Sequence, residues 1–124
     1  MEISSYRDLK VWQEAMSIAE RAYRLTARLP KEEVYGMTSQ IRRAATSVAA
    51  NIAEGHGRES GGSFIQFLRM AQGSLKELET HLLLALRVDL VASDEAKPVL
   101  AQCDELGRML RSLIRSIQRR QDHD

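Results

Sequence analysis

The stretch that decides the fold is residues 63–88, SFIQFLRMAQGSLKELETHLLLALRV. Its apolar residues recur at alternating intervals of four and three, the spacing of one face of an α-helix. A heptad stripe of this kind is typical of helices that pack side by side at shallow crossing angles. The sequence therefore predicts a long helix, with Ser63 and Gln66 forming a capping box at its start. The stripe consists of Phe64, Leu68, Ala71, Leu75, Leu78, Leu82 and Ala85.

Three further helices are expected, over residues 8–29, 38–54 and 94–120. Gly55 is expected to be the C-cap glycine of the second. Pro98 would lose a backbone hydrogen bond, so the regular part of the last helix is expected to begin nearer Lys97. Four helices joined by short links predict one all-α domain over residues 1–124, an antiparallel up-down-up-down four-helix bundle. The last helix repeats the heptad with Val99, Cys103, Leu106, Leu110, Leu113 and Ile117.

The helix expected over 8–29 has more apolar surface than a single core contact needs. One seam contains Val11, Ile18, Leu25 and Leu29, and a second seam, rotated by roughly 100°, contains Trp12, Met16, Ala19 and Tyr23. The helix over 38–54 carries a third face of mostly small side chains, which would let another helix approach closely. We therefore expect a homo-oligomer, because a monomer would leave the second seam poorly covered. The expected interface residues are Trp12, Tyr23, Arg42, Thr46, Ala49 and Ala53.

The basic residues are mainly arginines, and the net charge of the 124-residue chain is only +1. On the last helix the arginines fall within roughly 80° of one another, opposite the heptad stripe. Such a face is either simply solvated, helped by cations near a helix C-terminus, or a contact surface for phosphate groups. It carries no aromatic side chain on which a base could stack. The predicted nucleic-acid-binding residues are Arg108, Arg111, Arg115 and Arg119, with Arg43 and Arg58 elsewhere in the chain.

No pattern in the sequence predicts catalysis, a metal or a cofactor. A di-iron bundle needs glutamate and histidine three residues apart, whereas Glu77 and His81 are four apart. Cys103 falls on the core stripe, where a thiol is usually inert. The glycine-rich segment GHGRESGG lacks the lysine of a phosphate-binding loop. Glu79 flanks the core and needs a partner, for which Arg42 and Arg43, within the same subunit or in a neighbouring one, are the candidates.

The start of the chain has no apolar signal region, and no apolar run is long enough to span a bilayer. We therefore expect a cytoplasmic protein without a membrane partner. The single cysteine cannot form an intrachain disulfide.

Three segments resemble the 23S rRNA intervening-sequence protein family, also called the four-helix-bundle protein family. They are LKVWQEA (9–15), YGMTSQIRRAATSVAANIAEGHGR (35–58) and FLRMAQGSLKELETHLLLA (67–85). The resemblance implies a bacterial four-helix bundle that assembles as a homopentamer. It also extends to a related branch, the accessory variability proteins of diversity-generating retroelements, which engage a reverse transcriptase and nucleic acid. The family's Asn, Glu and Gly map onto Asn51, Glu54 and Gly55, whereas many members have proline in place of Ala49.

Two functions remain open from the sequence. The first is a non-catalytic oligomer that binds RNA or other nucleic acid through its arginine-rich faces. The alternative is a protein-interaction scaffold or adaptor ring that binds no nucleic acid, which the near-neutral net charge favours.

Overall fold

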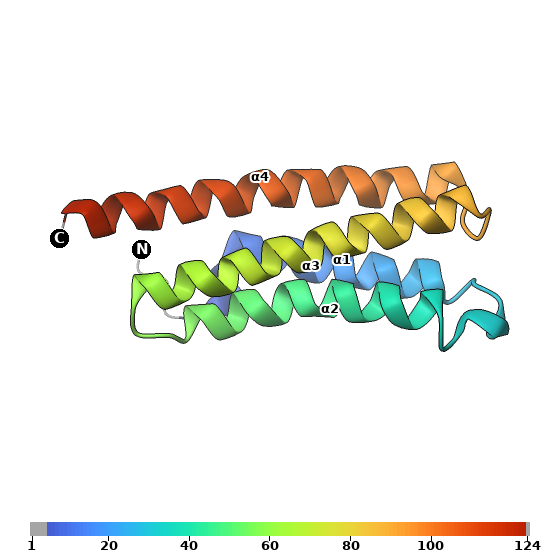
Figure 1. Ribbon diagram of the computed structural model, residues 1–124, viewed down its shortest axis with the longest axis horizontal. Helices are drawn as coiled ribbons and strands as arrows, with labels where there is room; N and C mark the ends of the chain where they lie inside the picture. The colour runs from blue at the N-terminus through green and yellow to red at the C-terminus, as the bar shows by residue number, and fades with distance from the viewer. Residues whose placement is uncertain (1–4, 124) are drawn as a thin grey trace.

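The computed structural model describes residues 5–123, and all regular structure in this range is helical. Four α-helices run alternately up and down along one long axis (Figure 1). Two short 3-10 turns, Tyr6–Asp8 and Lys31–Glu33, precede the first and second helices. The α-helices are α1 (Lys10–Thr26), α2 (Met37–His56), α3 (Gly61–Arg87) and α4 (Ser93–His123).

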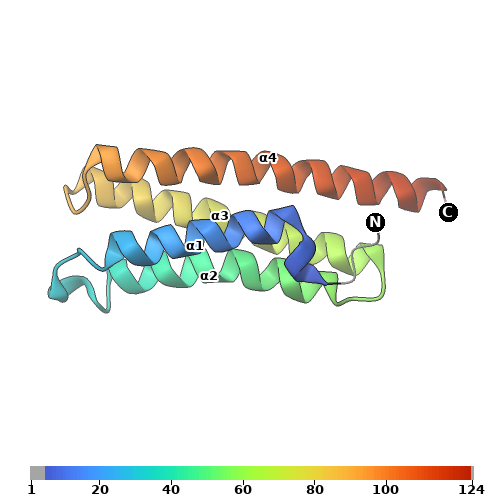
Figure 2. The ribbon, with the colours of Figure 1, turned by 180° about the vertical axis from the view of Figure 1, so that it is seen from behind.

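Each helix packs on the next one along the chain, and α4 closes the arrangement by packing on α1. This pattern confirms the predicted all-α up-down bundle. Seen from behind, α1 lies beside α2 and next to α4 (Figure 2). With 31 residues, α4 is much longer than α1 with 17, and its last turns extend past the other helices (Figure 1). Since the number of helices is even, α1 begins and α4 ends at the same end of the bundle.

The predicted heptad stripes form the core. On α3, the six stripe residues from Leu68 to Ala85 are each at most 1% exposed, and Phe64 packs against them at the margin. On α4 the stripe is confirmed except at one position, where Ile114 is buried and Leu113 is only half-buried. The real period of 3.6 residues drifts relative to the heptad and brings Ile114 inward toward the end of the helix.

The first helix is shorter than predicted. It begins at Lys10 because residues 6–8 form a separate 3-10 turn, capped where the Ser5 hydroxyl accepts a hydrogen bond from the Arg7 backbone N–H at 3.2 Å. It ends at Thr26, so Leu29 lies in the following link while still packing against the core. The first seam is therefore buried at Val11, Ile18 and Leu25.

Two predicted caps between α2 and α3 are wrong. Gly55 is not a C-cap but a buried residue inside α2, and the C-cap is Gly57. The N-cap of α3 is Ser60 rather than Ser63, since the Ser60 hydroxyl accepts a hydrogen bond from the Ser63 N–H at 3.1 Å. The glycine pair at 61–62 is thus the first turn of α3, where packing on Ile117 and Gln121 of α4 outweighs the low helix propensity of glycine.

The turn between α3 and α4 also differs from expectation. Asp89 takes the left-handed conformation, with φ at 61°, and the Leu90 N–H reaches back to the Ala85 carbonyl oxygen at 2.9 Å. Such a residue ends a helix in the manner usually reserved for glycine. Helix α4 then begins at Ser93 and includes Pro98, so the predicted start near Lys97 is wrong. Pro98 is exposed and near the helix start, where one missing hydrogen bond leaves a carbonyl free to bind water.

Candidate functional site

The predicted arginine face of α4 lies on the outside of the bundle. The core stripe of this helix faces α1 and α3, and Arg108, Arg111, Arg115 and Arg119 are exposed on the opposite side. Within residues 5–123, Arg111, Arg115 and Arg119 form no ion pair. One acidic residue, Asp122, follows Arg119 in the last turns. Three guanidinium groups on this face are therefore available to an anionic ligand.

Arg108 differs from its three neighbours because two carboxylates already bind it. Its guanidinium lies 2.6 Å from a carboxylate oxygen of Asp104 and 2.6 Å from one of Glu105. The hydrogen bond that Arg108 donates to Glu105, followed by the one that it donates to Asp104, raises the pKa of Arg108 above its ordinary value. Since the guanidinium is charged at any relevant pH, the important effect is that its charge is compensated locally. Arg108 is the weakest candidate of the four for phosphate contact.

The structure does not bring the other two predicted arginines onto this face. Arg43 is exposed on α2, and α2 makes no packing contact with α4 in the described chain. Arg58, in the turn after α2, lies 4.7 Å from the centre of the Phe67 ring and pairs with Glu54 at 3.4 Å. Its contacts anchor the turn between α2 and α3.

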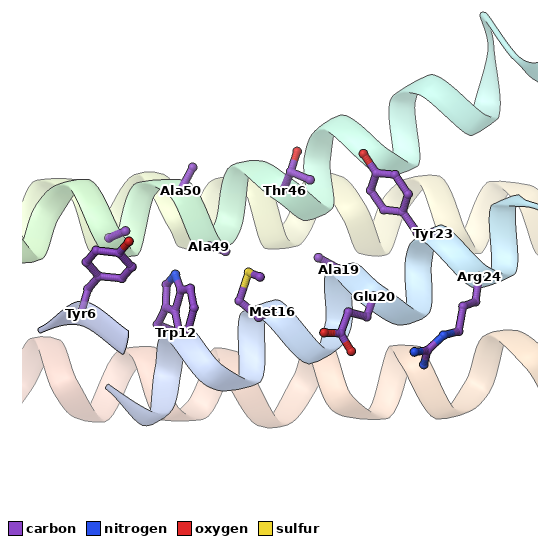
Figure 3. Close-up of a pocket in the computed structure, with 11 residues that line it drawn as sticks. Tyr6, Trp12, Met16, Ala19, Glu20, Tyr23, Arg24, Thr46, Ala49 and Ala50 are labelled. Carbon is purple, nitrogen blue, oxygen red and sulfur yellow. The ribbon is translucent and has the colours of Figure 1, made fainter. Parts of the chain in front are cut away.

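A second surface lies between α1 and α2 and has an apolar lining (Figure 3). It is an open groove of about 610 Å³. Five of the six predicted interface residues line it: Trp12, Tyr23, Thr46, Ala49 and Ala53. Tyr23 and Met16 are 44% and 37% exposed, whereas Trp12 is half-buried and Ala19 is buried, so the second seam of α1 is only partly covered in a single chain. Figure 3 shows Glu20 and Arg24 at its margin, where they give the groove a charged rim.

The groove includes residues that the sequence pattern did not identify. Tyr6 lies outside the helical period, but the 3-10 turn places its ring 5.3 Å from that of Trp12 in an edge-to-face contact. Ala50 lies on the face of small residues, and no feature of the sequence separated it from its neighbours. Tyr6 could have been predicted as a groove residue only with the knowledge that the turn before α1 folds back over α2.

Arg42, the sixth predicted interface residue, binds within its own chain. Its Nε donates to the Thr26 hydroxyl at 2.8 Å, and its Nη2 donates to the Tyr23 carbonyl oxygen at 3.4 Å. The guanidinium carbon lies 4.4 Å from the centre of the Tyr23 ring. A cation at the C-terminus of α1 also interacts favourably with the helix dipole. Arg42 therefore ties α2 to the end of α1.

The predicted partner of Glu79 is not found within the chain. Glu79 is only 17% exposed, and it pairs with Lys76 at 3.1 Å, one turn earlier on α3, rather than with Arg42 or Arg43 of the same chain. Pairing between subunits stays a prediction. A polar contact joins α2 to α3 where the hydroxyls of Ser47 and Ser74 lie 2.8 Å apart, and the Asn51 amide donates within α2 to the Ser47 carbonyl oxygen at 2.9 Å.

Gly55 lies at a close contact between α2 and α3. A Cβ atom at this position would lie 2.5 Å from the Cβ of Phe67, a distance that real structures do not tolerate. The close approach explains why a glycine occurs inside α2. The α2 helix is also continuous through Ala49.

The remaining candidates from the sequence are the titratable groups considered for metal binding and catalysis. No group of three or more His, Cys, Asp or Glu side chains within residues 5–123 could hold a metal ion. Burial, together with the nearby charge of Glu79, raises the pKa of Cys103 to about 12, so this thiol is protonated at neutral pH. His81 and Glu77 lie 3.4 Å apart on the surface of α3. In the part of the chain described, no helix is long and apolar enough to cross a membrane.

An additional polar contact joins α1 to α4. The Gln102 amide donates to the Glu14 carboxylate at 2.8 Å and to the Ser17 hydroxyl at 3.0 Å. This bridge fixes the register of the two helices, and it could not be predicted because its partners are far apart in the sequence.

Comparison with known proteins gives the family. No curated protein sequence matches the chain. Its fold is similar to the crystal structure of a protein of unknown function from the S23 ribosomal protein family of Bacteroides thetaiotaomicron, with a TM-score of 0.78 and 28% sequence identity. That similarity covers 84% of this chain and 97% of the other. The profile of the 23S rRNA-intervening sequence proteins matches residues 7–112. The protein therefore belongs to the 23S rRNA-intervening sequence protein family.

Proposed function

We propose that this protein is a non-catalytic homo-oligomer that binds nucleic acid through the phosphate backbone. The observation that carries the proposal is the exposed face of α4, where Arg111, Arg115 and Arg119 have no ion-pair partner among residues 5–123. A guanidinium matches the geometry of a phosphate group and forms paired hydrogen bonds with it. The resemblance to the accessory variability proteins, which engage nucleic acid, favours the same function.

The groove between α1 and α2 is the proposed contact with a second copy of the chain. Its apolar lining includes Trp12 and Tyr23, aromatic residues of the kind enriched in protein interfaces. The groove and the arginine face share no residue, so a subunit can use both at once. The resemblance implies a pentamer, and a closed ring would repeat the arginine face once per subunit.

The assembly can be tested by placing a charge in the groove. Ala50 is exposed and lines the groove, so Ala50→Arg should leave the bundle folded and dissociate the oligomer. The matched control is Ala101→Arg, which adds the same side chain at an exposed site on α4 outside the groove. Light scattering should show the wild type and the control as oligomers of equal mass and Ala50→Arg as a smaller species. A wild type that is monomeric at micromolar concentration would contradict the proposed assembly.

Nucleic-acid binding can be tested by fluorescence anisotropy with a labelled rRNA fragment across a range of salt concentrations. Each neutralised phosphate contributes about 0.9 to the slope of log affinity against log salt on a duplex. Three free arginines predict a slope of about −2.7 for each subunit that contacts the ligand.

Single substitutions then separate direct contact from net charge. Arg115→Gln should reduce the slope by about 0.9, whereas Arg108→Gln, which removes the same formal charge at a compensated site, should change it much less. Equal effects of the two substitutions, or binding that does not depend on salt, would contradict backbone contact by this face.

The second candidate function is an adaptor that binds another protein and no nucleic acid. The apolar groove favours it, because a helix of a partner could occupy the same surface. The two functions differ in the anisotropy titration: an adaptor would show no affinity for nucleic acid even at low salt.

A further inference from the structure

We infer that the arginine face of α4 selects double-stranded over single-stranded nucleic acid. This inference rests on the proposed function, since it concerns the ligand class of the same surface. Three observations carry it: the regular four-residue spacing of the free arginines, their position on the outward side of α4, and the location of the aromatic residues.

The free arginines form a row that turns gradually around α4. Arg111, Arg115 and Arg119 are four residues apart on one continuous helix, so successive residues rise by about 6 Å along the axis and rotate by about 40°, and the row extends about 12 Å along the axis. Along that length a duplex presents one phosphate charge per ~1.7 Å of its axis, whereas one strand of the duplex presents one per ~3.4 Å. A rigid row of cations therefore faces about twice the linear charge density on a duplex, without having to order a flexible strand.

The face offers nothing for unpaired bases. Proteins that bind single strands combine a basic groove that follows the backbone with aromatic side chains on which bases stack. Here the arginines lie on the outward side of α4, and α4 contains no Phe, Trp or Tyr. The six aromatic residues of the chain are Tyr6, Trp12, Tyr23, Tyr35, Phe64 and Phe67.

Those aromatic residues serve other contacts. Tyr6, Trp12 and Tyr23 line the groove between α1 and α2. Phe64 and Phe67 lie at the packing contact with Gly55. Tyr35 is 94% exposed, but it lies in the link between α1 and α2, at the end of the bundle opposite the C-terminus of α4 (Figure 1). A strand held on the arginine face thus gains no stacking energy.

The test is a competition between ligands of equal length, with the intact oligomer and one labelled 20-base-pair duplex as the probe. The competitors are the unlabelled duplex and either of its strands, in RNA and in DNA form. Over three contacts, the slopes of log affinity against log salt for duplex and single strand differ by about 0.6. Lowering the salt ten-fold, from 1 M to 0.1 M, therefore favours the duplex by about four-fold for each subunit engaged, and the duplex should compete better by at least this factor. Equal competition by duplex and strand would overturn the inference and leave the proposed function standing. Absence of binding to every ligand at low salt would overturn both.

A gain-of-function variant checks the cause of the preference. Asp104 is exposed on the same side of α4, so Asp104→Trp supplies a stacking platform beside the arginines, and Asp104→Leu is the matched control without a ring. Both variants release Arg108 from one carboxylate in the same way. Asp104→Trp should raise the affinity for single strands by about five-fold relative to Asp104→Leu and leave the duplex affinity unchanged. An unchanged duplex preference in Asp104→Trp would contradict the role assigned to the missing aromatic residues.

Discussion

Replacing Gly55 with alanine adds a single methyl group at a close contact between α2 and α3. The new Cβ would lie 2.5 Å from the Phe67 Cβ and 3.0 Å from the Phe64 Cδ1. Carbon atoms pack best at about 3.5–4.0 Å, so the helices must separate locally by about 1 Å. No rotamer change relieves the first clash, because the Phe67 Cβ is fixed to the backbone of α3.

The magnitude follows from two opposing effects. Overpacking a well-packed contact destabilises a protein by about 1–3 kcal/mol, and a clash between two Cβ atoms belongs at or above the upper end of that range. Alanine has a higher helix propensity than glycine, which offsets about 1 kcal/mol. The free energy of unfolding of Gly55→Ala should therefore fall by about 2 kcal/mol. For a chain of 124 residues this corresponds to a loss of about 8 °C in Tm.

Gly73→Ala is the matched control. Gly73 lies in the middle of α3 and is exposed, and a Cβ there would meet no other atom within 4 Å. This substitution should raise the free energy of unfolding by up to about 1 kcal/mol through helix propensity alone. Urea unfolding followed by circular dichroism, at one protein concentration for all variants, measures both values. A Gly55→Ala variant as stable as Gly73→Ala would refute the reasoning about the close contact.

Three other predictions concern particular contacts. Arg42→Lys keeps the charge but removes the guanidinium that packs on the Tyr23 ring and donates to the Thr26 hydroxyl. The free energy of unfolding in urea should therefore fall by about 1 kcal/mol, and an unchanged value would mean that the contact contributes nothing. Asp89→Gly should raise the free energy of unfolding by about 1 kcal/mol, because glycine adopts the left-handed conformation at φ 61° without strain. A lower Tm in this variant would contradict the prediction. Burial raises the pKa of Cys103 from 9.0 to about 12, so the thiol ionises at a lower pH in the unfolded chain than in the folded one. The free energy of unfolding should therefore fall more steeply from pH 9 to 12 in the wild type than in Cys103→Ala. Parallel curves of unfolding free energy against pH for the two proteins would rule this out.

The four helices could be predicted because each one has a periodic apolar stripe. The stripe from Leu68 to Ala85 is buried at every position, and hydrophobic spacing alone places it. The helix ends were less predictable, because local and tertiary effects compete there. Gly55 looked like a helix stop, but the approach of Phe67 requires a glycine inside the helix. Ser60 and Ser63 could each cap α3, and only the packing of Gly61 against α4 decides between them.

The surfaces were predictable to different degrees. Helical period places Arg111, Arg115 and Arg119 on one face, and the structure agrees that all three are exposed. The binding of Arg108 by Asp104 and Glu105 could also have been predicted from the sequence, because these carboxylates precede it by four and three residues on the same helix. The contact of Arg42 with Tyr23 could not have been predicted from the sequence, because it depends on the register between α1 and α2.

The even number of helices has a consequence for how the chain ends are presented. Helix α1 begins and α4 ends at the same end of the bundle, and α4 reaches beyond it (Figure 1). In a cyclic assembly every subunit has the same orientation relative to the symmetry axis. The start of α1 and the end of α4 of every subunit would then lie at a single rim. A fluorescent domain fused after α4 would be displayed as a cluster on that rim, so energy transfer between labels would report ring formation inside a cell.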